Sequence, residues 1–162
     1  MLRFERRLRH PVQDVWRALT EPTELDLWFP AHIQIEFRVG GRMTFAFLAN
    51  DIVPPPGTVT AIEPLRLFAF DWGEDGLRFE VTKAIGGCAL VFTHGFSDRR
   101  EAAKSAAGWH VCLDALEAVL RDELPEPPRE RWGALFGEYG RAFGEGEDDV
   151  GMVGRSHHEE PR

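Results

Sequence analysis

The sequence predicts an α+β domain in which a curved, seven-stranded antiparallel sheet wraps around one long helix. First, residues 33–96 alternate apolar and polar side chains with a period of two, and short turns rich in glycine and proline interrupt them. Second, the apolar period lengthens to about 3.6 after Phe96 and keeps that value to about Glu123. Successive strands joined by tight turns pair antiparallel, and a long helix with one apolar stripe must lie across a sheet.

The N-terminal region predicts one strand and two short helices. Residues 2–9 alternate apolar and charged side chains, which is typical of a strand with one solvated face. Pro11 suits the first turn of a helix, where its missing N–H costs nothing. The apolar face of this helix would comprise Val12, Val15, Trp16 and Leu19. Thr20 or Thr23 would cap a second helix, which ends at Phe29.

Six further strands are expected to form a meander. They are predicted at residues 33–39, 42–48, 58–62, 66–72, 77–84 and 88–96. Gly40-Gly41 and Gly86-Gly87 are typical of hairpin turns, and the proline-rich residues 54–57 predict a rigid loop. Together with residues 2–9, these segments make the seven strands of the sheet.

Ser97 or Asp98 is expected to cap the long helix, which runs to about Glu123 and is stopped by Pro125, a length on the order of 40 Å. Its apolar face would contain Ala102, Ala106, Trp109, Leu113, Leu116 and Leu120. A shorter helix is predicted at about 129–142. Residues 1–143 would therefore form one domain, and the acidic residues 144–162, poor in apolar side chains, a disordered tail.

Composition excludes several classes of protein. The formal charge is −8, which argues against nucleic acid as a partner, because phosphate binding needs a basic face. The longest stretch without a formal charge, residues 84–97, has 14 residues and is too short to cross a membrane. The N-terminus is charged from Arg3 onward, so we expect no secretory signal. Two cysteines without export signals indicate a reducing compartment, and the expected location is the cytoplasm.

The strongest candidate for a site is an apolar pocket between sheet and long helix. Small alanines in the first half of the helix face large aromatic residues on the strands, which leaves either a packed core or a cavity. An apolar cavity with few polar groups is the usual composition of a small-molecule site. The predicted ligand-binding residues are Trp28, His32, Phe45, Phe47, Phe70, Trp72, Phe79, Phe92, His94, Ala102, Ala106, Trp109 and Leu113.

His94 is the polar residue of greatest interest in this set. It shares a strand face with Leu90 and Phe92, so it should point inward. One interpretation is a buried neutral histidine held by a hydrogen bond. The other is that His94 orients a ligand, with Trp28, Trp72 and His32 around the mouth of the pocket.

Recognisable catalytic and metal-binding motifs are absent from the sequence. No C-x-x-C, H-x-x-x-H or H-E-x-x-H spacing occurs, so we predict no metal site, and His157-His158 in the tail lacks further ligands nearby. No G-x-S-x-G motif occurs, and Cys88 and Cys112 lack an adjacent histidine or lysine, so no catalytic nucleophile is predicted. The glycine pairs match no phosphate-binding pattern, and we expect no cofactor.

Several segments in order resemble the START-like (SRPBCC) superfamily, in particular the branch similar to the C-terminal domain of heat-shock chaperone ATPase activators (AHSA-type). The first is residues 10–22 followed by 25–30. The others are Phe37-Arg38-Val39-Gly40-Gly41, Phe70-Asp71-Trp72, Thr93-His94-Gly95-Phe96 and Gly108-Trp109-His110. The resemblance covers about residues 2–124 and implies a helix-grip fold with a hydrophobic cavity. It implies no single activity, because relatives include lipid carriers, hormone receptors, polyketide cyclases and chaperone activators.

Three functions follow as hypotheses. The leading one is a protein, monomer or homodimer, that binds a small apolar or amphipathic ligand without catalysis and without a membrane partner. The alternative, which rests on the resemblance, is a co-regulator that binds a chaperone ATPase or another protein through its surface. The third is a cyclase-like enzyme that uses His94 with Asp71 or Glu80, although both acids have outward parity on their strands.

Overall fold

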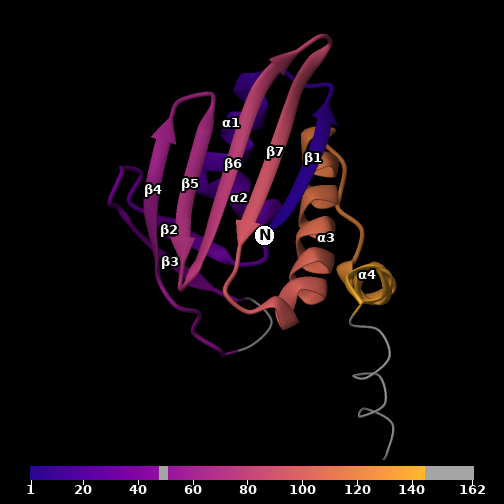
Figure 1. Ribbon diagram of the computed structural model, residues 1–162. Coiled ribbons are helices and arrows are strands. Elements are labelled where there is room, and N and C mark those ends of the chain that lie inside the picture. Colours follow the sequence, from indigo (N-terminus) through magenta and orange to yellow (C-terminus); the bar gives the residue numbers. More distant parts are fainter. Residues whose placement is uncertain (48–50, 145–162) are drawn as a thin grey trace, which may run out of the picture.

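The computed structural model describes residues 1–47 and 51–144, and it confirms the predicted α+β helix-grip fold (Figure 1). Seven strands form one antiparallel sheet in the order β1-β7-β6-β5-β4-β3-β2. The strands are β1 (Leu2–Leu8), β2 (His32–Ile35), β3 (Arg42–Ala46), β4 (Gly57–Glu63), β5 (Leu67–Trp72), β6 (Asp75–Ala84) and β7 (Gly87–Gly95). The helices are α1 (Val12–Thr20), α2 (Pro22–Trp28), α3 (Ala102–Leu120) and α4 (Pro128–Phe143), with a 3₁₀ turn at Arg99–Glu101.

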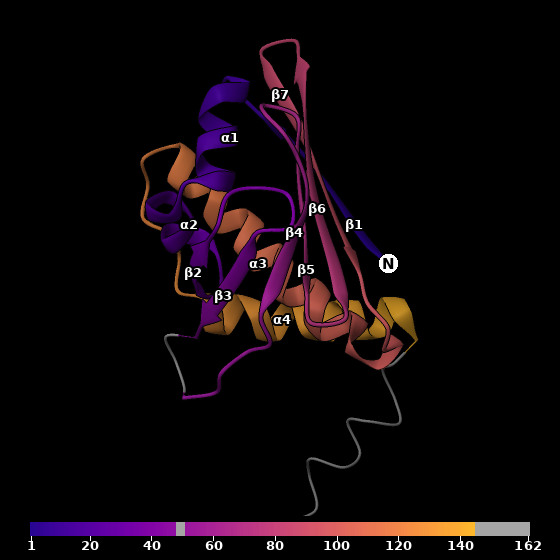
Figure 2. The ribbon, with the colours of Figure 1, turned by 90° about the vertical axis from the view of Figure 1, so that its left-hand side faces the viewer.

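The helices form a layer on one face of the sheet. Viewed edge-on, α1, α2 and α3 lie on the same side of the strands (Figure 2). Helix α3 contacts α1, α2 and β1, and α4 packs against α3. None of the helices in the described part of the chain is long and apolar enough to span a membrane.

Aromatic side chains from neighbouring strands fill the core. Phe92 of β7 is paired with Phe79 of β6 and Phe4 of β1, so all three side chains point to the same face. The ring centroids of Phe79 and Phe92 are 4.6 Å apart, and Trp109 of α3 is 4.6 Å from Phe92 on the helix side. The middle of the space between sheet and α3 is therefore packed, and a cavity remains beside the first half of α3.

The second strand is shorter than predicted. The alternation of residues 33–39 predicts a strand to Val39, but β2 ends at Ile35, and Phe37 and Val39 are exposed. A tight turn, in which the Arg38 N–H donates to the Glu36 carbonyl at 2.7 Å, takes the chain out of the ladder. Gly40, with φ of 79°, then donates to the Val59 carbonyl. Local turn formation therefore overrides the periodicity.

The starts of two helices differ in part from the prediction. Asp98 is an N-cap as expected, since its carboxylate accepts the Arg100 N–H, but it caps the 3₁₀ turn at Arg99–Glu101, and α3 itself begins at Ala102. With 19 residues, α3 is about 28 Å long. Neither threonine caps α2, because Thr20 Oγ1 donates to the Trp16 carbonyl within α1. Residues 145–162, almost all of the predicted tail with His157-His158, lie outside the described residues.

Candidate functional site

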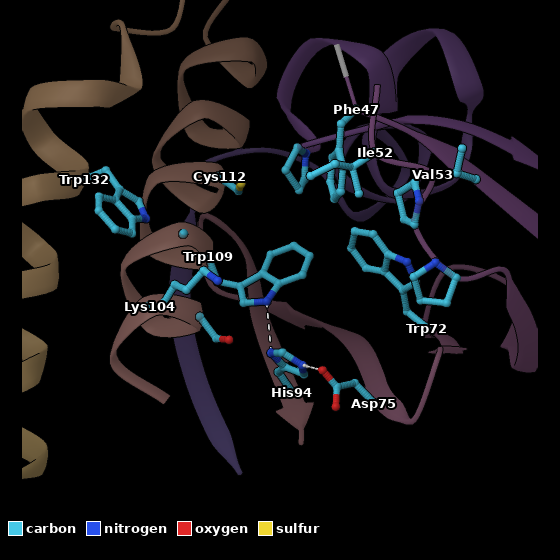
Figure 3. A pocket seen from close by; sticks show the side chains of 15 residues that line it. Phe47, Ile52, Val53, Trp72, Asp75, His94, Lys104, Trp109, Cys112 and Trp132 are labelled. Carbon is cyan, nitrogen blue, oxygen red and sulfur yellow. Dashed lines mark hydrogen bonds and ion pairs between the residues drawn. The ribbon is translucent and has the colours of Figure 1, made fainter. Parts of the chain in front are cut away.

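A pocket of about 520 Å³ opens at the end of the domain where α3 begins (Figure 3). It lies between α3, the β5–β6 hairpin, the end of β7 and the loop that follows β3. Most of its lining is apolar. The lining residues are Pro30, Phe47, Ile52, Val53, Pro54, Pro55, Trp72, Asp75, His94, Lys104, Ser105, Gly108, Trp109, Cys112 and Trp132.

Four of the residues predicted to bind a ligand line this pocket: Phe47, Trp72, His94 and Trp109. Six others are buried in the packed core and do not reach it, namely Phe45, Phe70, Phe79, Phe92, Ala106 and Leu113. Ala102 is buried at the start of α3, outside the pocket. The structure therefore brings four of the predicted residues together around the pocket, and the buried core residues lie apart from it.

Two residues expected at the mouth lie elsewhere. The Trp28 indole is buried, and its Nε1–H donates to the Ala18 carbonyl at 2.8 Å. The His32 imidazole is half-exposed, with its Nδ1 2.8 Å from an oxygen of Asp26. Neither side chain lines the pocket that contains His94, but Trp28 lines the adjoining cavity described below.

His94 lies at the floor of the pocket between two hydrogen-bond partners (Figure 3). Its Nδ1 is 3.0 Å from the Trp109 indole nitrogen, and its Nε2 is 3.0 Å from an Asp75 carboxylate oxygen. Because an indole N–H can only donate, Nδ1 of His94 must accept, which places the ring proton on Nε2. That proton is donated to Asp75. The geometry therefore fixes a neutral imidazole with both nitrogens engaged, so His94 has no free atom to act as a base.

The local register explains why these three side chains meet. His94 is opposite Leu77 on β6, and Asp75 lies two residues before Leu77 on the same face. The two-residue turn at Gly73-Glu74, with φ of 62° at Gly73, pairs Asp75 with Trp72. Sequence reasoning missed Asp75 because it began this strand at Leu77. The parity of 75, 77, 79 and 81 is the signal that could have found it.

The opposite wall comes from the loop after β3. Ile52 and Val53 lie across the pocket from Trp109 (Figure 3), and Pro54 also lines it. Of the buried side-chain polar atoms in the described ranges, Trp72 Nε1 is without a hydrogen-bond partner. Protein atoms cover this N–H, so the ring carbons of Trp72 form the wall. The sequence pattern predicted only a rigid loop here.

Helix α3 contributes a strip of small or short side chains to the pocket. Gly108 lies in the helix interior, where glycine costs about 1 kcal/mol relative to alanine. A Cβ added there would meet only Trp132 Nε1 of α4, at 3.9 Å. One turn later, burial raises the pKa of the Cys112 thiol to about 12, so this sulfur stays protonated and is a poor nucleophile.

A second cavity of about 450 Å³ adjoins the first. It shares Pro30, Gly108, Cys112 and Trp132 with it and continues between α2, α3 and the start of α4. Trp132 therefore forms part of both walls. Its ring stacks on Phe136 at 5.1 Å, and Phe136 is itself exposed.

Polar contacts fasten α4 to α3 beside these cavities. His110 Nδ1 is 2.8 Å from the Tyr139 hydroxyl, and Arg131 Nε donates to Asp114 at 2.7 Å. Burial lowers the pKa of His110 below its usual value because it disfavours the charged imidazolium, while nearby Asp114 partly opposes this effect. Burial likewise raises the pKa of the Tyr139 hydroxyl. Sequence reasoning did not predict the contact between His110 and Tyr139.

These contacts predict a loss of stability on mild acidification. Because the pKa of His110 is lower in the folded state, the unfolded chain takes up more protons as pH falls below about 6.5. The free energy of unfolding should therefore fall with pH in that range and level off below the folded-state pKa. His110→Gln, which keeps a partner for Tyr139, should show a smaller fall in urea titrations between neutral and mildly acidic pH. An unchanged pH profile in this variant would contradict the assignment.

The described residues contain no group of three or more histidine, cysteine, aspartate or glutamate side chains placed to hold a metal ion. The carboxylate beside His94 is Asp75, not Asp71 or Glu80. Asp71 is exposed, and Glu80 is paired with Arg78 at 2.8 Å. The arrangement proposed for a cyclase-like enzyme is therefore not present.

Comparisons with known proteins identify a matching family and similar solved structures. Residues 9–121 match the family model described as Activator of Hsp90 ATPase homolog 1-like protein. A conserved protein of unknown function from Enterococcus faecalis has a solved structure with a TM-score of 0.73 and 24% identity, covering 90% of this chain and 85% of that one. CalU16 from Micromonospora echinospora, in its solution NMR structure, gives 0.72 and 23% identity, covering 88% and 84%. These two structures support the fold alone.

No protein of the curated set matches the chain significantly. The family model nevertheless spans most of the sequence, including α1, α2, all strands from β2 to β7, and α3. The resemblance read from the sequence motifs is thereby confirmed. The chain belongs to the family of Activator of Hsp90 ATPase homolog 1-like proteins, within the START-like (SRPBCC) type of fold.

Proposed function

We propose that the protein binds a small apolar or amphipathic molecule in the pocket between α3, the β5–β6 hairpin and the loop after β3. The observation that carries the proposal is the pocket itself, about 520 Å³ and lined mainly by aromatic, aliphatic and proline side chains. Its volume lies within the range typical of small-molecule sites, and convergent polar groups are few there, as in such sites. Burial of a ligand's apolar surface would supply the affinity at roughly 25 cal/mol per Å².

The glycine in α3 adds an independent argument. A helix-interior glycine is unfavourable by about 1 kcal/mol, yet Gly108 lines both cavities at the point where they meet. Any larger side chain at this position would extend into the shared space. The cost is understandable if the open volume itself serves the protein.

Titration with the neutral fluorescent probe N-phenyl-1-naphthylamine tests the proposal. The probe should bind with saturable fluorescence enhancement, and native mass spectrometry should detect a one-to-one complex. Absence of saturable binding by either method would refute a ligand-binding role for the pocket.

Filling the pocket from α3 provides the matched variant. Gly108→Leu should lower probe affinity at least tenfold while leaving the free energy of unfolding unchanged or raised by up to about 1 kcal/mol. Gly133→Leu makes the same change on α4 at an exposed position without neighbours within 4 Å, and it should leave affinity unchanged. Equal affinities of the two variants would locate the probe somewhere else.

A second candidate is a co-regulator of a chaperone ATPase, which the family description favours. Such a protein would act through its surface, so its effect would not depend on the pocket. Stimulation of Hsp90 ATPase activity by the purified chain, equal in wild type and Gly108→Leu, would support this role. No stimulation across a full titration would remove it.

A further inference from the structure

The polar groups of the pocket are few and unequal in what they can bind. Asp75, His94, Lys104 and Ser105 are the lining residues with polar or charged side-chain groups besides the three indoles and Cys112. Asp75, His94 and Lys104 are the ones that can carry a charge. The charge and the hydrogen-bonding capacity that they leave unused determine which polar group a bound ligand would carry.

His94 offers a ligand no free nitrogen and no charge. Its Nδ1 accepts from Trp109 and its Nε2 donates to Asp75. The indole N–H of Trp109 occupies the lone pair of Nδ1, so the hydrogen-bonded ring is the neutral tautomer with its proton on Nε2. The negative charge of Asp75 is therefore not balanced by an imidazolium.

Asp75 retains unused acceptor capacity. One carboxylate oxygen accepts from His94, while Oδ1 makes no hydrogen bond or ion pair with the part of the chain that the structure describes. The side chain is 37% exposed and lies next to His94 at the floor of the pocket, on the side of the Trp72 ring (Figure 3). A carboxylate only accepts, so it selects a ligand group that donates, and a positive donor above all.

Lys104 does not balance this charge or provide an anion site. Its ammonium is 3.1 Å from a Glu101 carboxylate, and the side chain is 65% exposed at the rim. The lysine is thus paired and solvated. With His94 neutral and Lys104 paired, the uncompensated charge lining the pocket is negative.

We propose that the pocket selects amphipathic molecules with an apolar body and a protonated amine, and that Asp75 binds the ammonium group. This inference rests on the proposed ligand-binding function and specifies its ligand class. Trp72 and Trp109 provide aromatic surfaces in the same pocket, and such surfaces attract cations as well as apolar groups. An anionic amphiphile of equal length would meet repulsion at the same place.

Three probes with the same eight-carbon chain test the inference by isothermal titration calorimetry near neutral pH. Octylamine should bind about tenfold more tightly than 1-octanol, because its ammonium group forms an ion pair with the carboxylate where the hydroxyl is only a neutral donor. Octanoate should bind more weakly than 1-octanol. Octanol or octanoate binding as tightly as octylamine would overturn the amine preference and leave ligand binding intact. No binding of any of the three at the wild-type pocket would count against the proposed function itself.

Asp75→Asn separates charge from structure. An asparagine oxygen can still accept from His94 Nε2, so the network and the fold are kept while the negative charge is removed. In this variant, octylamine and 1-octanol should bind with about equal affinity. Glu74→Gln removes the same charge from an exposed neighbour in the same hairpin and should keep the preference. A preference that survives Asp75→Asn, or that both variants lose alike, would overturn the role of Asp75.

Discussion

Replacing Trp109 by alanine is expected to lower the free energy of unfolding by about 3–5 kcal/mol. The indole is 6% exposed and packs against Phe92 at 4.6 Å and Phe29 at 5.5 Å. Its removal would leave a cavity between α3 and the sheet and would deprive His94 Nδ1 of its donor. Urea denaturation followed by circular dichroism measures the loss. A change below about 1 kcal/mol would contradict the packing of this helix on the sheet.

Trp109→Phe is the matched control for the hydrogen bond. It keeps an aromatic ring against Phe92 but removes the N–H that His94 accepts. We expect a smaller loss, about 1–3 kcal/mol, which reflects a buried acceptor left without a partner and a partial cavity. A Trp109→Phe variant as unstable as Trp109→Ala would mean that the hydrogen bond dominates and the packing contributes little.

The arrangement of the elements could be predicted because burial imposes periodicity on the sequence. Phe79 and Phe92 have the inward parity that their strands predict, and the register places them against one another. The order of the strands in the sequence then determines their order in the meander, since tight turns join strands that are adjacent in the sheet. The predicted boundaries of elements are wrong where local backbone geometry competes with burial. Examples are the turn after Ile35 and the 3₁₀ turn before Ala102.

The site was harder to predict, because a pocket is the volume that side chains leave empty. Parity places Phe70 and Trp72 on the same face, but it does not reveal that Phe70 is buried in the core while Trp72 reaches the pocket. That distinction depends on where α3 begins and on the loop after β3, neither of which has a periodic signal. Trp132 enters from a helix far along the chain, which a strand-face argument cannot anticipate. His94 was recognised because a histidine among inward apolar residues needs polar partners.

Two phenylalanines that were predicted to bind a ligand should differ in what their replacement changes, because one lies in the core and the other lines the pocket. Replacement in the core should mainly lower stability, and replacement at the pocket should mainly weaken binding. Phe92 is fully buried and lies outside the pocket, so Phe92→Ala should lower the free energy of unfolding by about 3–5 kcal/mol. Phe47 is only partly buried and lines the pocket, with its ring 6.1 Å from Trp72. Phe47→Ala should cost about 1 kcal/mol of stability and weaken N-phenyl-1-naphthylamine binding severalfold.

The decisive comparison uses variants that stay folded. Phe92→Leu keeps most of the buried volume, so its probe affinity should equal that of wild type even though its unfolding midpoint is lower. Phe47→Leu should reduce affinity with little change in the midpoint. Denaturation and fluorescence titration on the same samples separate the two effects. If Phe92→Leu weakened binding more than Phe47→Leu did, the ligand would enter the space between sheet and helix after all, and the core would open to admit it.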